Sequence, residues 1–139
     1  MKLLIFMRKD LNMSTGKIAA QAAHAAQYME QYLTEQAQDP HNPHSMLKDT
    51  WERNNNKKVC LQVTGKEIAQ KTKDGSFIES MPAELLVLKG MAADIGCPIV
   101  KVVDAGRTEV APNTVTCLAM LVRDRDRTFD HYGVWTDDR

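Results

Sequence analysis

Two polar clusters, far apart in the chain, carry side chains that could hydrolyse an ester. One contains Lys17, just after Ser14-Thr15, a pair that can cap the first turn of a helix. The other contains Asp104, at the end of an apolar run. An aspartate can orient or deprotonate a water molecule, and a lysine near the amino end of a helix adds its charge to that of the exposed amides. Lys17 could therefore stabilise an oxyanion or hold a phosphate group.

Two threonines and a histidine accompany these charges. The hydroxyls of Thr108 and Thr116 could donate to an oxyanion or position the attacking water. Gln21 and His24 follow Lys17 at helical spacing, so the three lie on one helix face. His24 could shuttle a proton or touch the substrate. We take Lys17, Asp104, Thr108, Thr116 and His24 as candidate catalytic residues.

Each of these residues also has a simpler structural explanation. Asp104 before Gly106 alone would be a turn residue that accepts backbone hydrogen bonds. Thr116 alone would be an ordinary strand residue, and a histidine on an alanine-rich helix is more often structural than catalytic. The chemical interpretation therefore depends on whether the fold brings the two clusters together.

Four apolar runs rich in β-forming residues are the elements that must position these clusters. The predicted strands are Leu3–Met7, Lys58–Val63, Ile99–Val103 and Thr114–Val122, and helical patterns cover about 17–33, 45–53 and 82–95. Residues 66–73 are predicted as a loop with a short helical turn. Alternating strands and helices predict an α/β fold, namely a three-layer α/β/α domain with a mixed, roughly four-stranded β-sheet, spanning residues 1–139 as one domain.

Connection lengths predict how the strands are arranged. Residues 105–113 are too few for a crossover helix, so the fourth strand should run antiparallel to the third, with its first residues near Asp104. If the first and third strands are parallel, Lys17 comes to the same edge as Asp104. In open α/β sheets this edge, outside the carboxyl ends of the strands, is where ligands bind.

The overall charge gives no argument for a nucleic-acid partner. Lys+Arg and Asp+Glu both number 18, so any RNA contact must come from a local patch. The candidate contact residues near the two clusters or on the second strand are Arg8, Lys9, Gln21, Lys58 and Arg107. Arg8 and Arg107 are the strongest of these because each belongs to one of the clusters.

The sequence predicts neither a metal site nor a cofactor. His41 and His44 with Asp39 could bind a metal in principle, but a polar loop bounded by prolines is the simpler interpretation. Ile18 stands where a nucleotide-binding P-loop requires Ser or Thr. The apolar run at residues 1–7 is too short to span a membrane, so we expect no membrane partner.

The two clusters resemble the signature segments of the peptidyl-tRNA hydrolase type 2 family. The similarity runs from Arg8 to His24 and from Asp104 to Thr116, and it extends to Trp51-Glu52 before the second strand. It implies hydrolysis of the ester between a peptide and tRNA. It also implies that Lys17, Asp104, Thr108 and Thr116 are catalytic, with His24 following the helix motif.

The resemblance further implies a cytoplasmic enzyme that acts on peptidyl-tRNA, and it leaves a homodimer open. Asn54-Asn55-Asn56 replaces the Gly-Gln that commonly follows the tryptophan helix, and residues 131–135 replace the usual Gly-His-Leu-Lys-Leu ending. A second hypothesis is therefore a non-catalytic module of the same fold that binds tRNA or a protein. The retained Lys17 and Asp104 argue against it. A third is hydrolysis of a different ester or amide.

Overall fold

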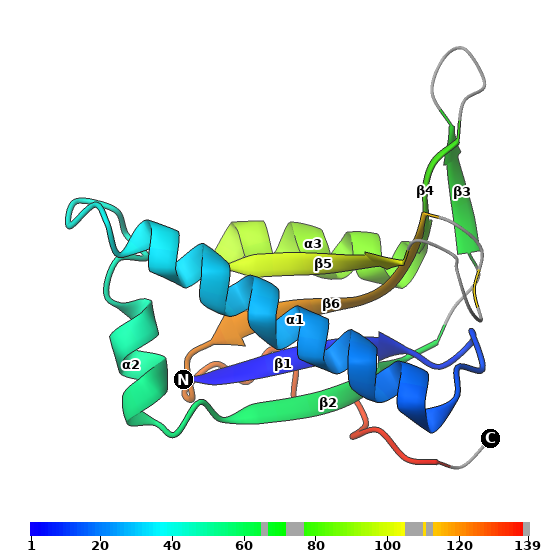
Figure 1. The fold of residues 1–139 in the computed structure, drawn as a ribbon, viewed down its shortest axis with the longest axis horizontal. Coiled ribbons are helices and arrows are strands. Elements are labelled where there is room, and N and C mark those ends of the chain that lie inside the picture. Colours follow the sequence, from blue (N-terminus) through cyan, green and yellow to red (C-terminus); the bar gives the residue numbers. More distant parts are fainter. Residues whose placement is uncertain (65–66, 72–76, 105–109, 111–112, 138–139) are drawn as a thin grey trace.

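The fold is an α/β sandwich around one mixed sheet (Figure 1). The computed structural model describes residues 1–64, 67–71, 77–104, 110 and 113–137. Along the chain the elements are β1 (Lys2–Arg8), α1 (Thr15–Gln36), α2 (Leu47–Arg53), β2 (Lys58–Val63), β3 (Glu67–Lys71), β4 (Phe77–Pro82), α3 (Ala83–Ile95), β5 (Ile99–Asp104) and β6 (Thr114–Val122).

The four predicted strands form the main part of the sheet. β1 pairs in parallel with β2 on one side and antiparallel with β6 on the other, and β5 pairs antiparallel with β6. β1 and β5 therefore run in the same direction, and their carboxyl ends lie at one edge together with the start of β6. The predicted antiparallel connection and the predicted mixed sheet are both confirmed.

The prediction of a loop with a helical turn at residues 66–73 was wrong. β3 and β4 form an antiparallel hairpin, which joins β6 through a single pairing of Ser80 with Thr114 and makes the described sheet six-stranded. In Figure 1 this hairpin projects from the rest of the molecule. Its strands satisfy each other's backbone groups, and the partner strand β4 lies outside the residues 66–73 on which the prediction was based.

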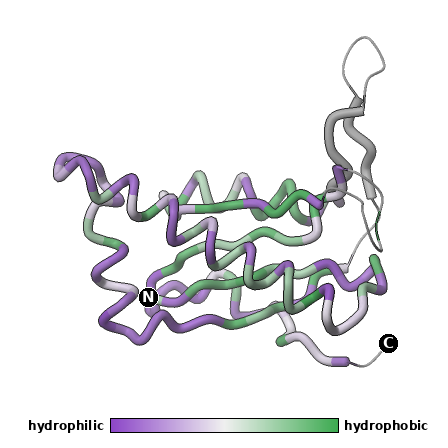
Figure 2. Tube along the Cα trace, in the orientation of Figure 1, coloured by the Kyte–Doolittle hydropathy of each residue, from purple (hydrophilic) through white to green (hydrophobic). Residues whose placement is uncertain are grey.

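Helices cover both faces of the sheet. α1 and α2 pack on one face and α3 on the other, each over its own cluster of buried apolar residues. α1 presents one buried stripe at helical spacing, made of Gln21, Ala25, Met29 and Leu33. Figure 2 shows hydrophobic residues concentrated along the sheet and hydrophilic ones in the loop after α1. The alanines of α1 make it slim, so its axis can lie close to the strands.

Ser14 caps the start of α1, and Gly96 caps the end of α3. The Ser14 hydroxyl accepts a hydrogen bond from the Lys17 amide at 3.2 Å, which caps the amino end of α1. α3 ends at Gly96, whose φ of 72° is the left-handed conformation that glycine adopts without strain. The first cap matters for the site because it fixes where the turn carrying Lys17 begins.

Candidate active site

Lys17 and Asp104 meet at the carboxyl edge of the sheet. The Lys17 Nζ lies 2.5 Å from Asp104 Oδ1, although 87 positions separate the two residues in the chain. Their side chains are 12% and 8% exposed, so the pair is mostly buried and still reachable from solvent. The first turn of α1 supplies the lysine and the last residue of β5 supplies the aspartate. The predicted convergence of the two clusters is present in the structure.

A β-bulge places the Thr116 side chain on the face of the sheet that α1 covers. In the pairing of β5 with β6, Val102 lies opposite Cys117 and Val103 opposite Val115, so Thr116 is an extra residue in β6. A bulge interrupts the alternation of side chains between the two faces of a strand. Thr116 and Cys117 consequently both contact Gln21 of α1. The bulge is a feature that the sequence analysis did not predict.

The Thr116 hydroxyl donates to the Gln21 side chain. The distance from Oγ1 to Gln21 Oε1 is 2.5 Å, and the two residues are 0% and 3% exposed. Gln21 lies one turn after Lys17, so this hydrogen bond ties the strand with the bulge to the helix that carries the lysine. Gln21 was predicted to contact the substrate. Its burial indicates that it positions Thr116 and α1 in this structure.

Thr114 is a further polar residue at this edge that the sequence analysis did not select. It is 2% exposed and lies directly opposite Asp104 in the β5–β6 pairing. The Asn113 amide also donates to the Asp104 carbonyl at 3.1 Å, with Asn113 at a φ of 61°. The backbone around Asp104 is thus held by the start of β6. The sequence did offer a signal for this residue, because Thr114 is the first residue of a predicted strand and lies two positions before Thr116.

Arg8 occupies a setting that does not match its predicted contact with tRNA. The residue has no exposed surface, and its guanidinium donates to both carboxylate oxygens of Asp10, at 3.1 and 2.6 Å. A third donation, at 3.2 Å, goes to the carbonyl of Val115, the residue next to the bulge. An arginine buried in this way cannot reach a phosphate backbone without leaving these partners, so we correct its assignment from an RNA contact to a support of the bulged strand.

The two predicted lysine contacts lie at opposite ends of the sheet. Lys9 follows β1 at the site edge, and its ammonium donates to the side chains of Gln62 and Thr136. Lys58 starts β2, opposite Leu3, and is exposed with its ammonium 5.2 Å from the Trp51 ring. The structure therefore brings Lys9 near the edge that carries Lys17 but leaves Lys58 at the far end.

His24 lies further along α1 on its exposed side. Its ring stacks on that of Tyr28, with centroids 5.9 Å apart and planes at 17°. This contact leaves His24 accessible to a bound substrate, one further turn beyond Gln21. Thr108 and Arg107, which were also predicted as site residues, lie outside the described residues.

The thiol nearest the site is protected from ionisation. Burial raises the pKa of Cys117 to about 12, so the residue is a neutral apolar neighbour of Gln21 at physiological pH. Cys60 and Cys97 are free thiols whose pKa values burial also raises. The Cys117 thiol is therefore poorly suited to act as a nucleophile.

Two features of the described part of the chain concern other kinds of site. No group of three or more His, Cys, Asp or Glu side chains there is arranged to hold a metal ion. Instead of forming such a group, His44 bonds the Tyr32 hydroxyl at 2.7 Å and the Gly96 carbonyl at 2.9 Å. Among these same residues, no helix has the length and apolar character needed to cross a membrane.

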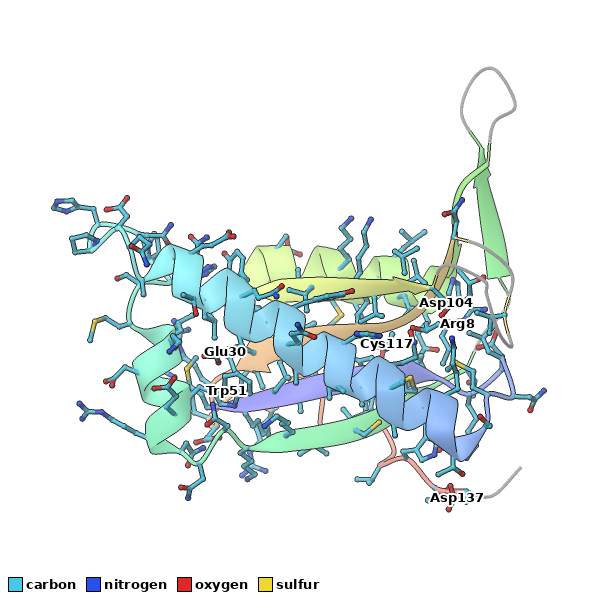
Figure 3. The ribbon with its side chains drawn as sticks, in the orientation of Figure 1. Arg8, Glu30, Trp51, Asp104, Cys117 and Asp137 are labelled. Atoms are coloured by element: carbon cyan, nitrogen blue, oxygen red, sulfur yellow. The ribbon has the colours of Figure 1, made fainter. Side chains whose placement is uncertain are left out.

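These groups together suit hydrolysis by general base and electrostatic catalysis. A carboxylate that can activate water lies beside an ammonium and the amino end of a helix, and both can stabilise negative charge developing on a carbonyl oxygen. A buried threonine and glutamine hold the supporting strand and helix at fixed positions. Figure 3 shows Asp104 and Cys117 at this end of the sheet, with α1 crossing in front of it.

Comparison with known proteins assigns the chain to a family. The family model described as peptidyl-tRNA hydrolase PTH2 matches residues 1–127. A peptidyl-tRNA hydrolase of Methanopyrus kandleri is 37% identical over 119 residues, which cover 86% of this chain and 82% of the relative. One from Thermococcus onnurineus is 33% identical over 119 residues, covering 86% and 81%.

A human relative, peptidyl-tRNA hydrolase 2, mitochondrial, is 31% identical over 119 residues, which cover 86% of this chain and 54% of the relative. The family match contains both clusters that meet at the carboxyl edge of the sheet. Because the family model matches most of the chain and these relatives share more than 30% identity with it, the chain belongs to the peptidyl-tRNA hydrolase PTH2 family.

Proposed function

We propose that this protein hydrolyses the ester bond between a peptide and the 3′-terminal adenosine of tRNA, at the edge defined by Lys17 and Asp104. Family membership supports the reaction. The observation that carries the site is the 2.5 Å contact between Lys17 and Asp104, because it joins two segments distant in sequence into one partly open polar cluster.

In the proposed mechanism, Asp104 accepts a proton from water as the water oxygen attacks the ester carbonyl. The ammonium of Lys17 and the amino end of α1 stabilise the oxyanion that forms. The bond to the ribose oxygen then breaks, and the proton held by Asp104 passes to that oxygen. The products are free tRNA and a peptide with a carboxylate. The residues present can complete this cycle without a metal or an organic cofactor.

The remaining candidates take supporting roles in this proposal. Thr116 and Gln21 position α1 against the bulged strand, and Thr108 donates a hydrogen bond to the oxyanion. His24, on the accessible side of α1, contacts the substrate. Arg107 contacts the tRNA backbone, and the exposed Lys58 contacts it only if the tRNA extends along the molecule to the far end of the sheet.

The cellular setting follows from the substrate. Peptidyl-tRNA is a product of translation, so we place the protein in the cytoplasm, where it returns tRNA for reuse. The proposed site is built from one copy of the chain, and a homodimer is compatible with it.

The test is to incubate the purified protein with N-acetylaminoacyl-tRNA in the presence of EDTA, with unblocked aminoacyl-tRNA as the control. We expect release of free tRNA from the blocked substrate in EDTA, and much slower release from the unblocked one. Loss of activity in EDTA that zinc restores would overturn the metal-free mechanism. Tight binding of tRNA with no turnover would instead favour the non-catalytic module.

A further inference from the structure

A cavity of about 360 Å³ lies beside the first turn of α1. One wall comes from the β1–α1 connection and that first turn, with Asn12, Met13, Thr15 and Ile18. The opposite wall comes from the C-terminal segment, with Trp135 and Thr136. Its volume is within the range of pockets that bind small molecules.

The C-terminal wall lies beyond the part of the chain that the family model matches. The family match ends at residue 127, and the segment beyond it folds back along the free edge of β2. The Gln62 amide donates to the Gly133 carbonyl at 3.0 Å, and the Trp135 amide donates to the Cys60 carbonyl at 2.9 Å. The backbone that carries Trp135 is therefore held by strand-like hydrogen bonds.

Lys9 also lines the cavity and contacts the Trp135 side chain there. Its ammonium lies 5.0 Å from the centroid of the Trp135 ring and donates to Thr136 Oγ1 at 3.3 Å and Gln62 Oε1 at 3.1 Å. An ammonium over an indole ring is an attractive contact. The ring thus forms a pre-organised wall, and a ligand that stacks on it loses little side-chain entropy.

The position of the cavity relates it to the proposed active site. Thr15 and Ile18 line the cavity, and Lys17 lies between them in the same turn of α1. A group bound in the cavity is therefore adjacent to the turn that carries the Lys17–Asp104 pair. In peptidyl-tRNA the base of the terminal adenosine is joined to the reacting ester through a single ribose, so it is a group that could lie on one side of this turn while the ester lies on the other.

We propose that this cavity binds the adenine base of the 3′-terminal adenosine, stacked on Trp135. The inference rests on the proposed function. Stacking on an aromatic side chain is a general way to hold an unpaired base, and Met13 and Ile18 add apolar surface for its faces. Asn12, Thr15 and Thr136 can bond the polar edge of the base. Every tRNA ends in this adenosine whereas peptide side chains vary, so a rigid cavity suits the constant part of the substrate.

The direct test uses tryptophan fluorescence and adenosine 5′-monophosphate. The chain has two tryptophans, and Trp51 is only 2% exposed, so a bound nucleotide should report through Trp135. We expect saturable quenching by the nucleotide in the unmodified protein, its loss in Trp135→Phe, and weaker quenching by cytidine 5′-monophosphate. Absent quenching, or equal quenching in Trp135→Phe, would overturn the proposal. Quenching by N-acetylphenylalanine amide but not by the nucleotide would overturn it in favour of the peptide.

Kinetics with N-acetylaminoacyl-tRNA provide the second measurement. Trp135→Ala should raise KM by about tenfold, within the range measured for base stacking, and leave kcat within about twofold. Trp135→Phe keeps an aromatic ring and should show a smaller increase, which separates stacking from misfolding. An unchanged KM in Trp135→Ala would contradict the proposal.

The two measurements distinguish failure of the cavity assignment from failure of the proposed function. If the unmodified protein binds the nucleotide through Trp135 but does not hydrolyse the tRNA ester, the function is wrong and the cavity assignment stands. If it hydrolyses the ester while the nucleotide fails to quench Trp135, the function stands and the cavity assignment is wrong.

Discussion

Two pairs of opposite charges lie at the same end of the sheet, where Figure 3 labels Arg8 and Asp104. They differ in sequence separation and in the exposure of their basic side chains. Lys17 and Asp104 come from positions 87 apart, share a contact of 2.5 Å and are 12% and 8% exposed. Arg8 and Asp10 are near neighbours in the chain, and Arg8 is completely buried. The first pair joins α1 to β5, whereas the second extends from the end of β1 toward β6.

The difference shows which kind of contact suits an arginine and which suits a lysine at this edge of the sheet. The planar guanidinium of Arg8 satisfies a carboxylate and the Val115 carbonyl together, which suits a fixed structural contact. The ammonium of Lys17 is a compact charge that remains partly accessible, which suits a charge that must meet a substrate. Both residues belong to one segment of the sequence, and only their burial and partners separate their roles.

The largest effect should come from removing the buried guanidinium. Arg8→Met should lower the free energy of unfolding by about 3 kcal/mol, because it leaves Asp10 and the Val115 carbonyl without this donor. Urea unfolding measures the change. The matched control is Arg53→Met on the exposed pair with Asp49, where about 0.5 kcal/mol or less is expected. A similar loss in the two variants would remove the contrast between the pairs.

The Lys17–Asp104 pair should act on turnover. Asp104→Asn and Lys17→Met should each lower kcat for N-acetylaminoacyl-tRNA by about 100-fold or more, equivalent to about 2.7 kcal/mol in the transition state. Lys48→Met, which changes a partly exposed lysine bonded to Glu52, is the control and should keep full activity. Asp104→Asn should bind tRNA as well as the unmodified protein does, since a lost negative charge cannot weaken attraction to phosphate. Full turnover by a folded Asp104→Asn variant would refute the base assignment.

A smaller effect is expected at the bulge, which lies between the two pairs. Thr116→Val keeps the shape of the side chain and removes the hydroxyl that donates to Gln21. We expect kcat to fall about tenfold, or about 1.4 kcal/mol, through loss of the fixed position of α1. Thr50→Val, on the exposed side of α2, is the matched control. An unchanged kcat would show that the bulge serves the fold alone.

The smallest effect is a pH dependence of stability from Cys117, whose pKa is raised to about 12 by burial. Below pH 9 the thiol is protonated in both the folded and the unfolded chain, so it adds no pH dependence. Between pH 9 and 10 the unfolded chain loses this proton while the folded chain keeps it, and the free energy of unfolding falls by about 1 kcal/mol.

Comparing Cys117→Ala with the unmodified protein over pH 9 to 10 isolates this contribution. The variant should show a shallower fall in the urea-derived free energy, even though its stability at neutral pH is lower. Equal slopes would mean that water reaches the thiol, and that the face shared by the bulge and α1 is wetter than its burial indicates.

Four of the strands and their relative directions could be predicted from the sequence. Runs of apolar β-forming residues predicted β1, β2, β5 and β6, and the short connection at 105–113 predicted that β6 returns antiparallel to β5. Directionality alone then brought Lys17 to the edge of Asp104. These inferences succeeded because burial and loop length constrain the chain locally, and because strand direction leaves only one edge at which the two segments can end together.

The tertiary structure alone decided which polar groups became accessible. The bulge at Thr116 depends on the pairing of β6 with β5, so no local pattern predicts it. β3 and β4 pair with each other, and the Asp74-Gly75 between them in the sequence is a hairpin signal that the sequence analysis did not use. Arg8 was predicted to contact tRNA because the sequence does not show that Asp10 and the Val115 carbonyl lie close enough to bond its buried guanidinium. Trp135 lines a cavity only because the C-terminal segment pairs with β2. The sequence by itself determined four of the six described strands, the relative directions of those four and the meeting of the two clusters. The register of the strands and the pairing of Lys17 with Asp104 arise from contacts between distant segments, which exist only once the chain is folded.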